Sequence, residues 1–450
     1  MTMKKASGIC LALATAASPA VAQSSLEVSG QIDFGTRAYV NDGLYVGQST
    51  SRAYGVLGFS LDGGFDVGAD GDVAFSFSGL AEEGNDRSYY NIERLYYRHV
   101  FSNWDILVGF NTENWGVVES SSVLNVINPR ANADPVAGDT LLGTPMINVN
   151  VYTGAGTFSA YALTGFIEPF YGDERSRFRA PIIPDYESTV FEEGSGRHLD
   201  YALRYSNSFS AGQADIDVAA SFFSGTDRSA VCSTTGTGAT SCADAILTAL
   251  GNPPGSPAPG SSTDAFFAFL EANANSALLA NASGVQVPGL QAFYQEVDQF
   301  GLSGVYTRND LQLRFEASHT DTSTGSYFAG VIGGDYTWND VFGGPGSLTM
   351  AVEYLYDDRS SAQGIPLFED DVFLGLQYRF NNPLDSVIDF SVFHDLTTSA
   401  KLYRLGVSSR ITDRVGVALN ASAVDTDGFD DPLAFIRQDN FVELMFSAYF

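Results

Sequence analysis

The sequence predicts an all-β protein, a transmembrane antiparallel up-and-down β-barrel of about 18 strands, with 16 as the alternative count. Three observations predict it. Apolar and polar residues alternate over stretches of about ten residues. The connections between these stretches are in turn short and long. Beyond the first two dozen residues, no apolar run is long enough for a membrane-spanning helix, which needs roughly 20 residues.

The composition excludes two other classes. The chain has 450 residues and a formal net charge of −30, so it lacks the basic surface that binds nucleic acid. Aromatic residues make up 13% and hydrophobic residues 44% of the chain. Acidic disordered chains are poor in both kinds of residue, so an ordered fold is expected.

The N-terminal segment, residues 1–22, is typical of a cleaved secretory signal peptide. Lys4 and Lys5 form its basic start, an apolar stretch covers 9–17, and the small residues Ala20 and Ala22 mark a cleavage site. The alternative is a buried N-terminal helix. We therefore expect the barrel to be formed by residues 23–450.

The strands are predicted from strict alternation bounded by Gly, Asn, Asp and Ser. In one example, Leu313 and Phe315 alternate with Arg314 and Glu316. The same pattern, read along the chain, gives strands near 26–40, 53–62, 71–82, 89–101, 103–111, 146–153, 157–166, 198–208, 213–224, 296–308, 310–321, 327–338, 346–357, 370–380, 385–396, 402–411, 414–425 and 439–450.

One face of these strands is apolar and the other carries charged residues, as expected for lipid outside and water inside. A secreted soluble β-protein is the alternative, but its strands would seldom keep charged residues so regularly opposite the apolar ones. Aromatic residues gather at the strand ends, as in the interfacial girdles of membrane barrels. They include Tyr89, Tyr90, Trp115, Tyr327 and Tyr356 toward the long connections, and Phe101, Trp104, Trp338, Phe380 and Phe450 toward the short ones.

In these features the chain resembles a Gram-negative outer-membrane porin. The residues that carry the resemblance are the leader, a first strand at 26–35, and a last strand, 441–450, with apolar residues at every second position and a terminal Phe450. The resemblance implies a multi-pass outer-membrane protein with both termini in the periplasm and contacts with lipid and lipopolysaccharide. It further implies a homotrimer without a cofactor, and 18 strands favour the substrate-selective kind.

The resemblance also implies that a long loop, here 111–145, folds inward and narrows the pore. This loop is acidic, and the spacing of Val123, Leu124, Val126 and Ile127 predicts a short helix within it. An ordinary extracellular loop is the alternative. The acidic candidates for the constriction are Glu113, Glu119, Asp134 and Asp139.

Arginines on the inward face of the early strands are expected to face this loop and to set up a transverse field across the pore. They are Arg37, Arg52, Arg94 and Arg98. Other charged residues are predicted on the rest of the lumen wall, where pairing with a cross-strand carboxylate is the alternative role for each arginine. These are Arg204, Arg314, Glu316, Glu353, Arg379 and Arg404.

Two further long connections are predicted, at 167–197 and 225–295. The second begins with Cys232 and Cys242, which we expect to form a disulfide because an exported chain meets an oxidising compartment. Helical spacing over 265–282 predicts a folded lid or plug over the mouth of the barrel, with a solvated flap as the alternative.

A calcium site is a weaker hypothesis at Asp425, Asp427 and Asp430, because the position where an EF-hand needs its bidentate glutamate is Ile436. A solvated acidic turn is the alternative. Catalysis has little support, since His99, His198, His319 and His394 are scattered without zinc-like spacing.

The leading hypothesis is a non-enzymatic porin that admits small polar or charged solutes by passive diffusion, with a mild preference for cations. Two other hypotheses stay open. One is a plugged structural or adhesive barrel, and the other is a barrel-embedded outer-membrane hydrolase.

Overall fold

The computed structural model describes residues 26–45, 47–82, 84, 87–132, 134, 140–172, 174–179, 184–192, 199–233, 290–426 and 431–450, with isolated residues at 242, 244, 247, 255–257 and 269. The predicted leader, Asp139, Asp427, Asp430, His198 and the predicted helix at 265–282 (except Phe269) lie outside the described residues.

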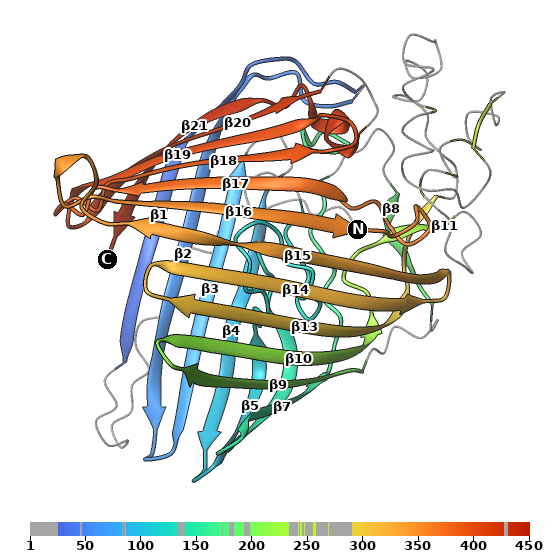
Figure 1. Ribbon diagram of the computed structural model, residues 1–450. Helices are drawn as coiled ribbons and strands as arrows, with labels where there is room; N and C mark the ends of the chain where they lie inside the picture. Colours follow the sequence, from blue (N-terminus) through green and yellow to red (C-terminus); the bar gives the residue numbers. More distant parts are fainter. Residues whose placement is uncertain are drawn as a thin grey trace, which may run out of the picture.

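The described strands form an 18-stranded antiparallel barrel, so the predicted fold class is confirmed and the alternative of 16 strands is not. Each strand pairs with the next barrel strand along the chain (Figure 1). The strands are β1 (Glu27–Tyr39), β2 (Ala53–Val67), β3 (Gly71–Glu82), β4 (Tyr89–Val100), β5 (Trp104–Asn111), β6 (Thr144–Thr153), β7 (Gly156–Leu163), β9 (Asp200–Ala211), β10 (Ala214–Thr226), β13 (Glu296–Arg308), β14 (Leu311–Thr322), β15 (Gly325–Trp338), β16 (Ser347–Asp357), β17 (Asp370–Arg379), β18 (Val387–Asp395), β19 (Lys401–Thr412), β20 (Val415–Asp425) and β21 (Phe441–Tyr449).

The barrel closes where the last strand meets the first. β21 pairs antiparallel with β1, from Gln31 opposite Tyr449 to Tyr39 opposite Phe441. The backbone of Phe450 also exchanges two hydrogen bonds with Gly30, at 2.9 and 3.0 Å. Closure matters because an open sheet edge would leave backbone groups unpaired in lipid.

The alternation read from the sequence corresponds to the two surfaces of the wall. On β14 the outward Leu313 and Phe315 are 48% and 42% exposed, whereas the inward Arg314 and Glu316 are buried inside the barrel. On β9 the outward Tyr201 is likewise exposed. No helix of the described residues is long and apolar enough to cross a membrane.

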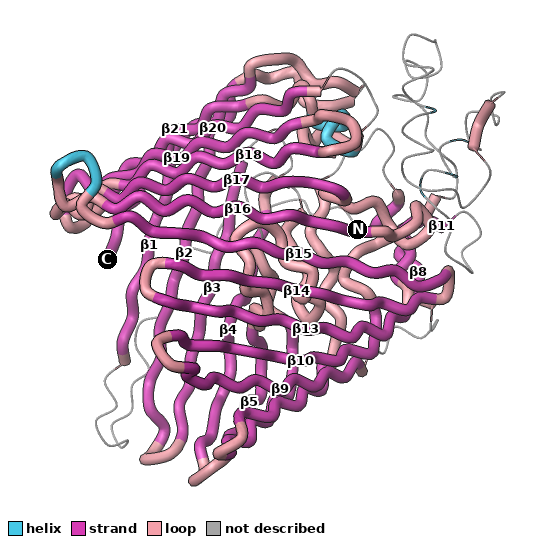
Figure 2. Tube along the Cα trace, viewed as in Figure 1, coloured by secondary structure: helices cyan, strands magenta, loops and turns pink. Residues whose placement is uncertain are grey.

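A second, three-stranded sheet lies at the long-loop end, and the sequence did not predict it (Figure 2). It consists of β8 (Asp185–Phe191), β11 (Val231–Ser233) and β12 (Gln291–Tyr294), with β12 parallel to β8 and antiparallel to β11. These strands have three to seven residues, too few for an alternating pattern.

Two 3₁₀ turns complete the described elements, η1 (Val341–Gly343) and η2 (Pro432–Ile436). η1 lies at the short end, between β15 and β16, and η2 at the long-loop end, between β20 and β21. Between β13 and β14, Asn309 has a φ of 53°, a left-handed conformation that Asn tolerates better than most residues.

Candidate functional site

The segment joining β5 to β6, residues 112–143, carries most of the predicted acidic site. Its described residues contain no helix, so the helix predicted at 123–127 is wrong. The backbone amide of Val123 donates to Glu316 on β14 at 3.0 Å, and that of Leu124 to the Ser122 hydroxyl at 3.1 Å. Side-chain oxygens on β14 and within the segment thus accept these backbone amides.

Glu316 binds this segment at several points. Its carboxylate accepts backbone amides of Val117 and Val118 at 2.5 and 3.2 Å, and the hydroxyl of Ser122 at 2.8 Å. Glu353, on β16, accepts the amides of Glu119 and Ser120 at 2.9 and 2.8 Å. The segment thus reaches from β5 and β6 to the wall at β14 and β16.

The far part of the segment is bound to β1 through buried ion pairs. Asp134 accepts a hydrogen bond from Arg37 at 2.6 Å and another from Arg87. Arg37 also pairs with Glu443 on β21 at 2.8 Å, and Arg87 with Glu82 on β3. Arg37 and Asp134, predicted on opposite sides of the pore, are therefore bonded to each other.

Apolar packing fixes the rest of the segment to the wall formed by β5, β6, β7, β9, β10 and β13. Trp115, Leu124 and Ile127 are buried in a cluster with inward side chains of these strands, which are Leu107, Met146, Tyr161, Leu163, Ala202, Phe223 and Val297. The segment fills this side of the lumen, so open space is left along the other side.

Among the described residues, two cavities lie in that space, along β15 to β19. The loop-side cavity, of about 540 Å³, lies between the 112–143 segment and the 358–369 loop. The turn-side cavity, of about 470 Å³, is lined by inward residues of β15 to β19 such as Asp335 and Arg379. Glu119 and Arg404 line both cavities, so we call the place where the cavities meet the Glu119–Arg404 passage.

The charges at the passage come from two different elements. Glu119 belongs to the segment, and its carboxylate pairs with Arg314 on β14, which also pairs with Asp335 on β15. Arg404 is on β19, with its guanidinium carbon 5.1 Å from the centre of the Phe393 ring. A carboxylate and a guanidinium facing one passage create a field across it.

Glu113 lies apart from both cavities. Its carboxylate accepts a hydrogen bond from Asn111 at 2.8 Å and one from the Tyr161 hydroxyl at 3.4 Å. Burial raises the pKa of the Glu113 carboxyl above its usual range, and these two hydrogen bonds oppose the rise.

The other predicted arginines have different surroundings. Arg52 directly precedes β2 and forms an exposed pair with Asp42 at 2.8 Å. Arg94 and Arg98 pair with Asp62 and Asp72, Arg379 donates to Gln377, and Arg204 donates to the backbone oxygen of Trp115.

Sequence reasoning missed two arginines that the structure places beside the lumen. Arg87, which pairs with Asp134, lies in the connection before β4. Arg359 forms three hydrogen bonds with Asp357, at 2.9, 3.0 and 2.6 Å, and lines the loop-side cavity. Neither lies within a strand, so alternation gave no signal for them.

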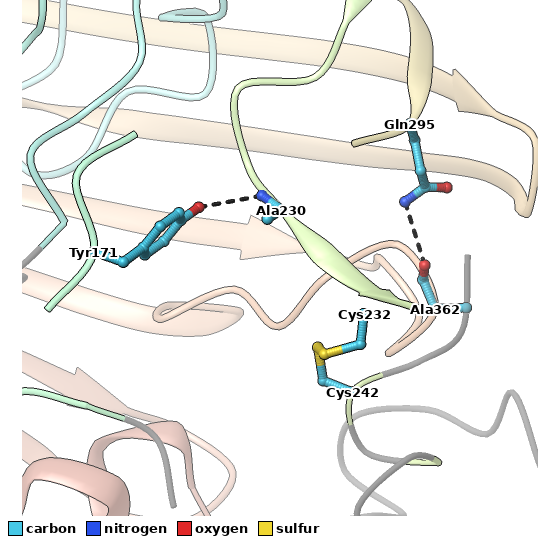
Figure 3. The surroundings of a disulfide bond; sticks show 6 residues. All are labelled: Tyr171, Ala230, Cys232, Cys242, Gln295 and Ala362. Atoms are coloured by element: carbon cyan, nitrogen blue, oxygen red, sulfur yellow. Dashed lines mark hydrogen bonds between the residues drawn. A yellow bond between two sulfur atoms is a disulfide. The ribbon is translucent and has the colours of Figure 1, made fainter. Parts of the chain in front are cut away.

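Cys232, in β11, forms a disulfide with Cys242 (Figure 3). Close by, the Tyr171 hydroxyl accepts the amide of Ala230 at 3.2 Å, and the Gln295 side chain donates to the backbone of Ala362 at 3.4 Å. The three-stranded sheet is thus linked to the 358–369 loop at the barrel mouth.

The described residues include no group of three His, Cys, Asp or Glu side chains placed to hold a metal ion. Of the three predicted calcium ligands, only Asp425 is described, and its carboxylate lies 4.0 Å from the Lys401 ammonium.

Comparisons with known proteins give likeness of architecture only. No profile of a known protein family and no curated protein matches the chain. Among solved structures, OprB of Pseudomonas putida at high pH is 10% identical over 94% of each chain, with a TM-score of 0.44. A double mutant of the Rhodopseudomonas blastica porin is 10% identical over 95% of this chain and 100% of that one, with a TM-score of 0.39. The second of these structures is named as a porin.

Proposed function

We propose that the chain forms a water-filled channel in the outer membrane of a Gram-negative bacterium, through which small polar or charged solutes diffuse passively. The observation that carries this proposal is the pair of cavities that meet at the Glu119–Arg404 passage inside the barrel. In this proposal the 112–143 segment is the constriction loop.

The surroundings in this proposal are those implied by the porin resemblance. Exposed apolar side chains such as Leu313 and Ile332 contact lipid, lipopolysaccharide covers the outer leaflet, and both termini are periplasmic. The chain assembles as a homotrimer and needs no cofactor.

Planar-bilayer recordings of the purified protein test the channel. Stepwise openings in potassium chloride are expected. A protein that inserts into the bilayer but gives no current steps would contradict the proposal and favour the plugged structural barrel.

The same recordings test the mild cation preference. Glu119 lines the passage and its side chain is 55% exposed, so Glu119→Gln should lower the potassium-to-chloride permeability ratio measured from the reversal potential. Glu113→Gln is the matched control, because Glu113 lies away from both cavities and should leave the ratio unchanged. Equal ratios for both variants and the wild type would show that Glu119 does not set the selectivity.

A further inference from the structure

The loop-side cavity has two chemically different walls. The 112–143 segment contributes hydroxyl and amide side chains, among them Ser120, Ser121 and Asn125. The 358–369 loop contributes half-buried apolar side chains, which are Ile365, Leu367 and Phe368. A solute in this cavity therefore contacts hydroxyl and amide groups on the segment and an apolar surface on the 358–369 loop.

Contacts between aromatic rings hold the apolar surface in place. The Phe368 ring stacks on Phe393 with centroids 4.1 Å apart and an interplanar angle of 10°. Phe393 in turn packs against Phe373, at 4.9 Å between centroids, and Phe373 lines the turn-side cavity. This aromatic cluster, Phe368, Phe393 and Phe373, runs behind the passage from one cavity to the other.

All three acidic side chains that line the loop-side cavity are paired with arginines, but only Glu119, which pairs with Arg314, has a largely exposed side chain, at 55%. Asp134 is bonded to Arg37 and Arg87, and Asp357 to Arg359. The charges common to both cavities are Glu119, on the 112–143 segment, and Arg404, on β19.

A solute with a single charge is attracted by one of these two groups and repelled by the other. A zwitterion places its ammonium group toward Glu119 and its carboxylate toward Arg404, and both contacts are favourable. An apolar side chain on the same solute then rests against Leu367 and Phe368 and leaves water. The cavity volume of about 540 Å³ is in the range of small-molecule sites.

We infer that the loop-side cavity is a binding site for zwitterionic α-amino acids with apolar side chains. This inference rests on the proposed channel function and names its preferred solutes.

Uptake by proteoliposomes that contain the full chain tests the inference, with labelled solutes at low concentration. Leucine should enter roughly four-fold faster than the smaller glycine, the equivalent of about one buried methylene group. Leucine should also enter faster than N-acetylleucine, which keeps the apolar side chain and the carboxylate but lacks the ammonium group.

A pair of variants tests the cavity itself. Leu367→Ser should bring the leucine-to-glycine ratio close to one, because Leu367 lines the cavity. Leu396→Ser is the matched control, since Leu396 is exposed and is not among the lining residues of either cavity. Both variants should keep the wild-type conductance in potassium chloride.

The outcomes separate the two proposals. Normal conductance with glycine entering faster than leucine, as in a simple sieve, would overturn the amino-acid site and leave the channel. An equal drop in the ratio for both variants would overturn the assignment to this cavity. A chain without conductance would contradict the channel itself.

Discussion

Glu316 acts as a hydrogen-bond acceptor for the backbone of the 112–143 segment. Its carboxylate takes three amides and one hydroxyl from residues up to 199 positions earlier in the chain. Alternation predicted that Glu316 faces the lumen, because that property depends only on strand parity. Its partners could not be predicted, because they depend on where a distant segment crosses the barrel.

At the scale of this residue, Glu316→Ala should loosen the loop. Each buried amide left without an acceptor costs about 1–3 kcal/mol, so the segment should leave its position and the open-channel current should become noisier. Single-channel noise analysis measures this effect. Asp217→Ala, on the exposed inward face of β10, is the control. Quiet currents from both variants would show that Glu316 does not hold the loop.

At the scale of the element, the 112–143 segment is fixed by three kinds of contact. Carboxylates on β14 and β16 bind its backbone, an apolar cluster holds Trp115 and Leu124, and Asp134 pairs with two arginines near β1. The sequence indicated an acidic inward loop through the resemblance. The sequence could not indicate that contacts with the barrel wall, and not a helix, set the shape of this segment.

Asp134→Asn tests the ionic attachment of this element. The substitution leaves two buried arginines without their shared carboxylate, a change that costs about 3–5 kcal/mol when a buried pair is broken. The midpoint temperature of thermal unfolding of the Asp134→Asn variant in detergent should therefore be lower than that of the wild type. Asp42→Asn breaks the exposed pair with Arg52 and should leave the midpoint unchanged. Similar midpoints for both variants would argue against a structural role for Asp134.

At the scale of the whole molecule, the barrel separates two solvents. Leu419 and Asn420 are neighbours on β20, yet Leu419 faces outward and is exposed, whereas the Asn420 amide reaches Glu443 inside at 3.5 Å. The same positive charge should therefore have opposite consequences at the two positions.

Leu419→Lys should destabilise the barrel by about 2–4 kcal/mol, the cost of a basic side chain on the lipid face near the midplane. Asn420→Lys should be tolerated, because its ammonium group meets water and Glu443. Unfolding by chemical denaturant in lipid vesicles measures the free energy of unfolding of both variants. Equal stability of the two variants would contradict the lipid-facing assignment of this surface.

The sequence by itself predicted the strands of the barrel, with 18 or 16 as their number, the faces of the wall that their side chains take, and the division into short turns and long loops. All of these follow from local alternation, because a strand turns successive side chains to opposite sides whatever its distant neighbours are. The pairing of each strand with the next then follows from the short turns.

Only the tertiary structure decided where the open path lies. The 112–143 segment packs against β5, β6, β7, β9, β10 and β13, and the Glu119–Arg404 passage lies beside β15 to β19. It also decided that Arg37 is bonded to Asp134 and that Arg52 stays in an exposed pair. These contacts join residues far apart in the chain, and no local pattern records them because they depend on how the closed barrel brings opposite walls together.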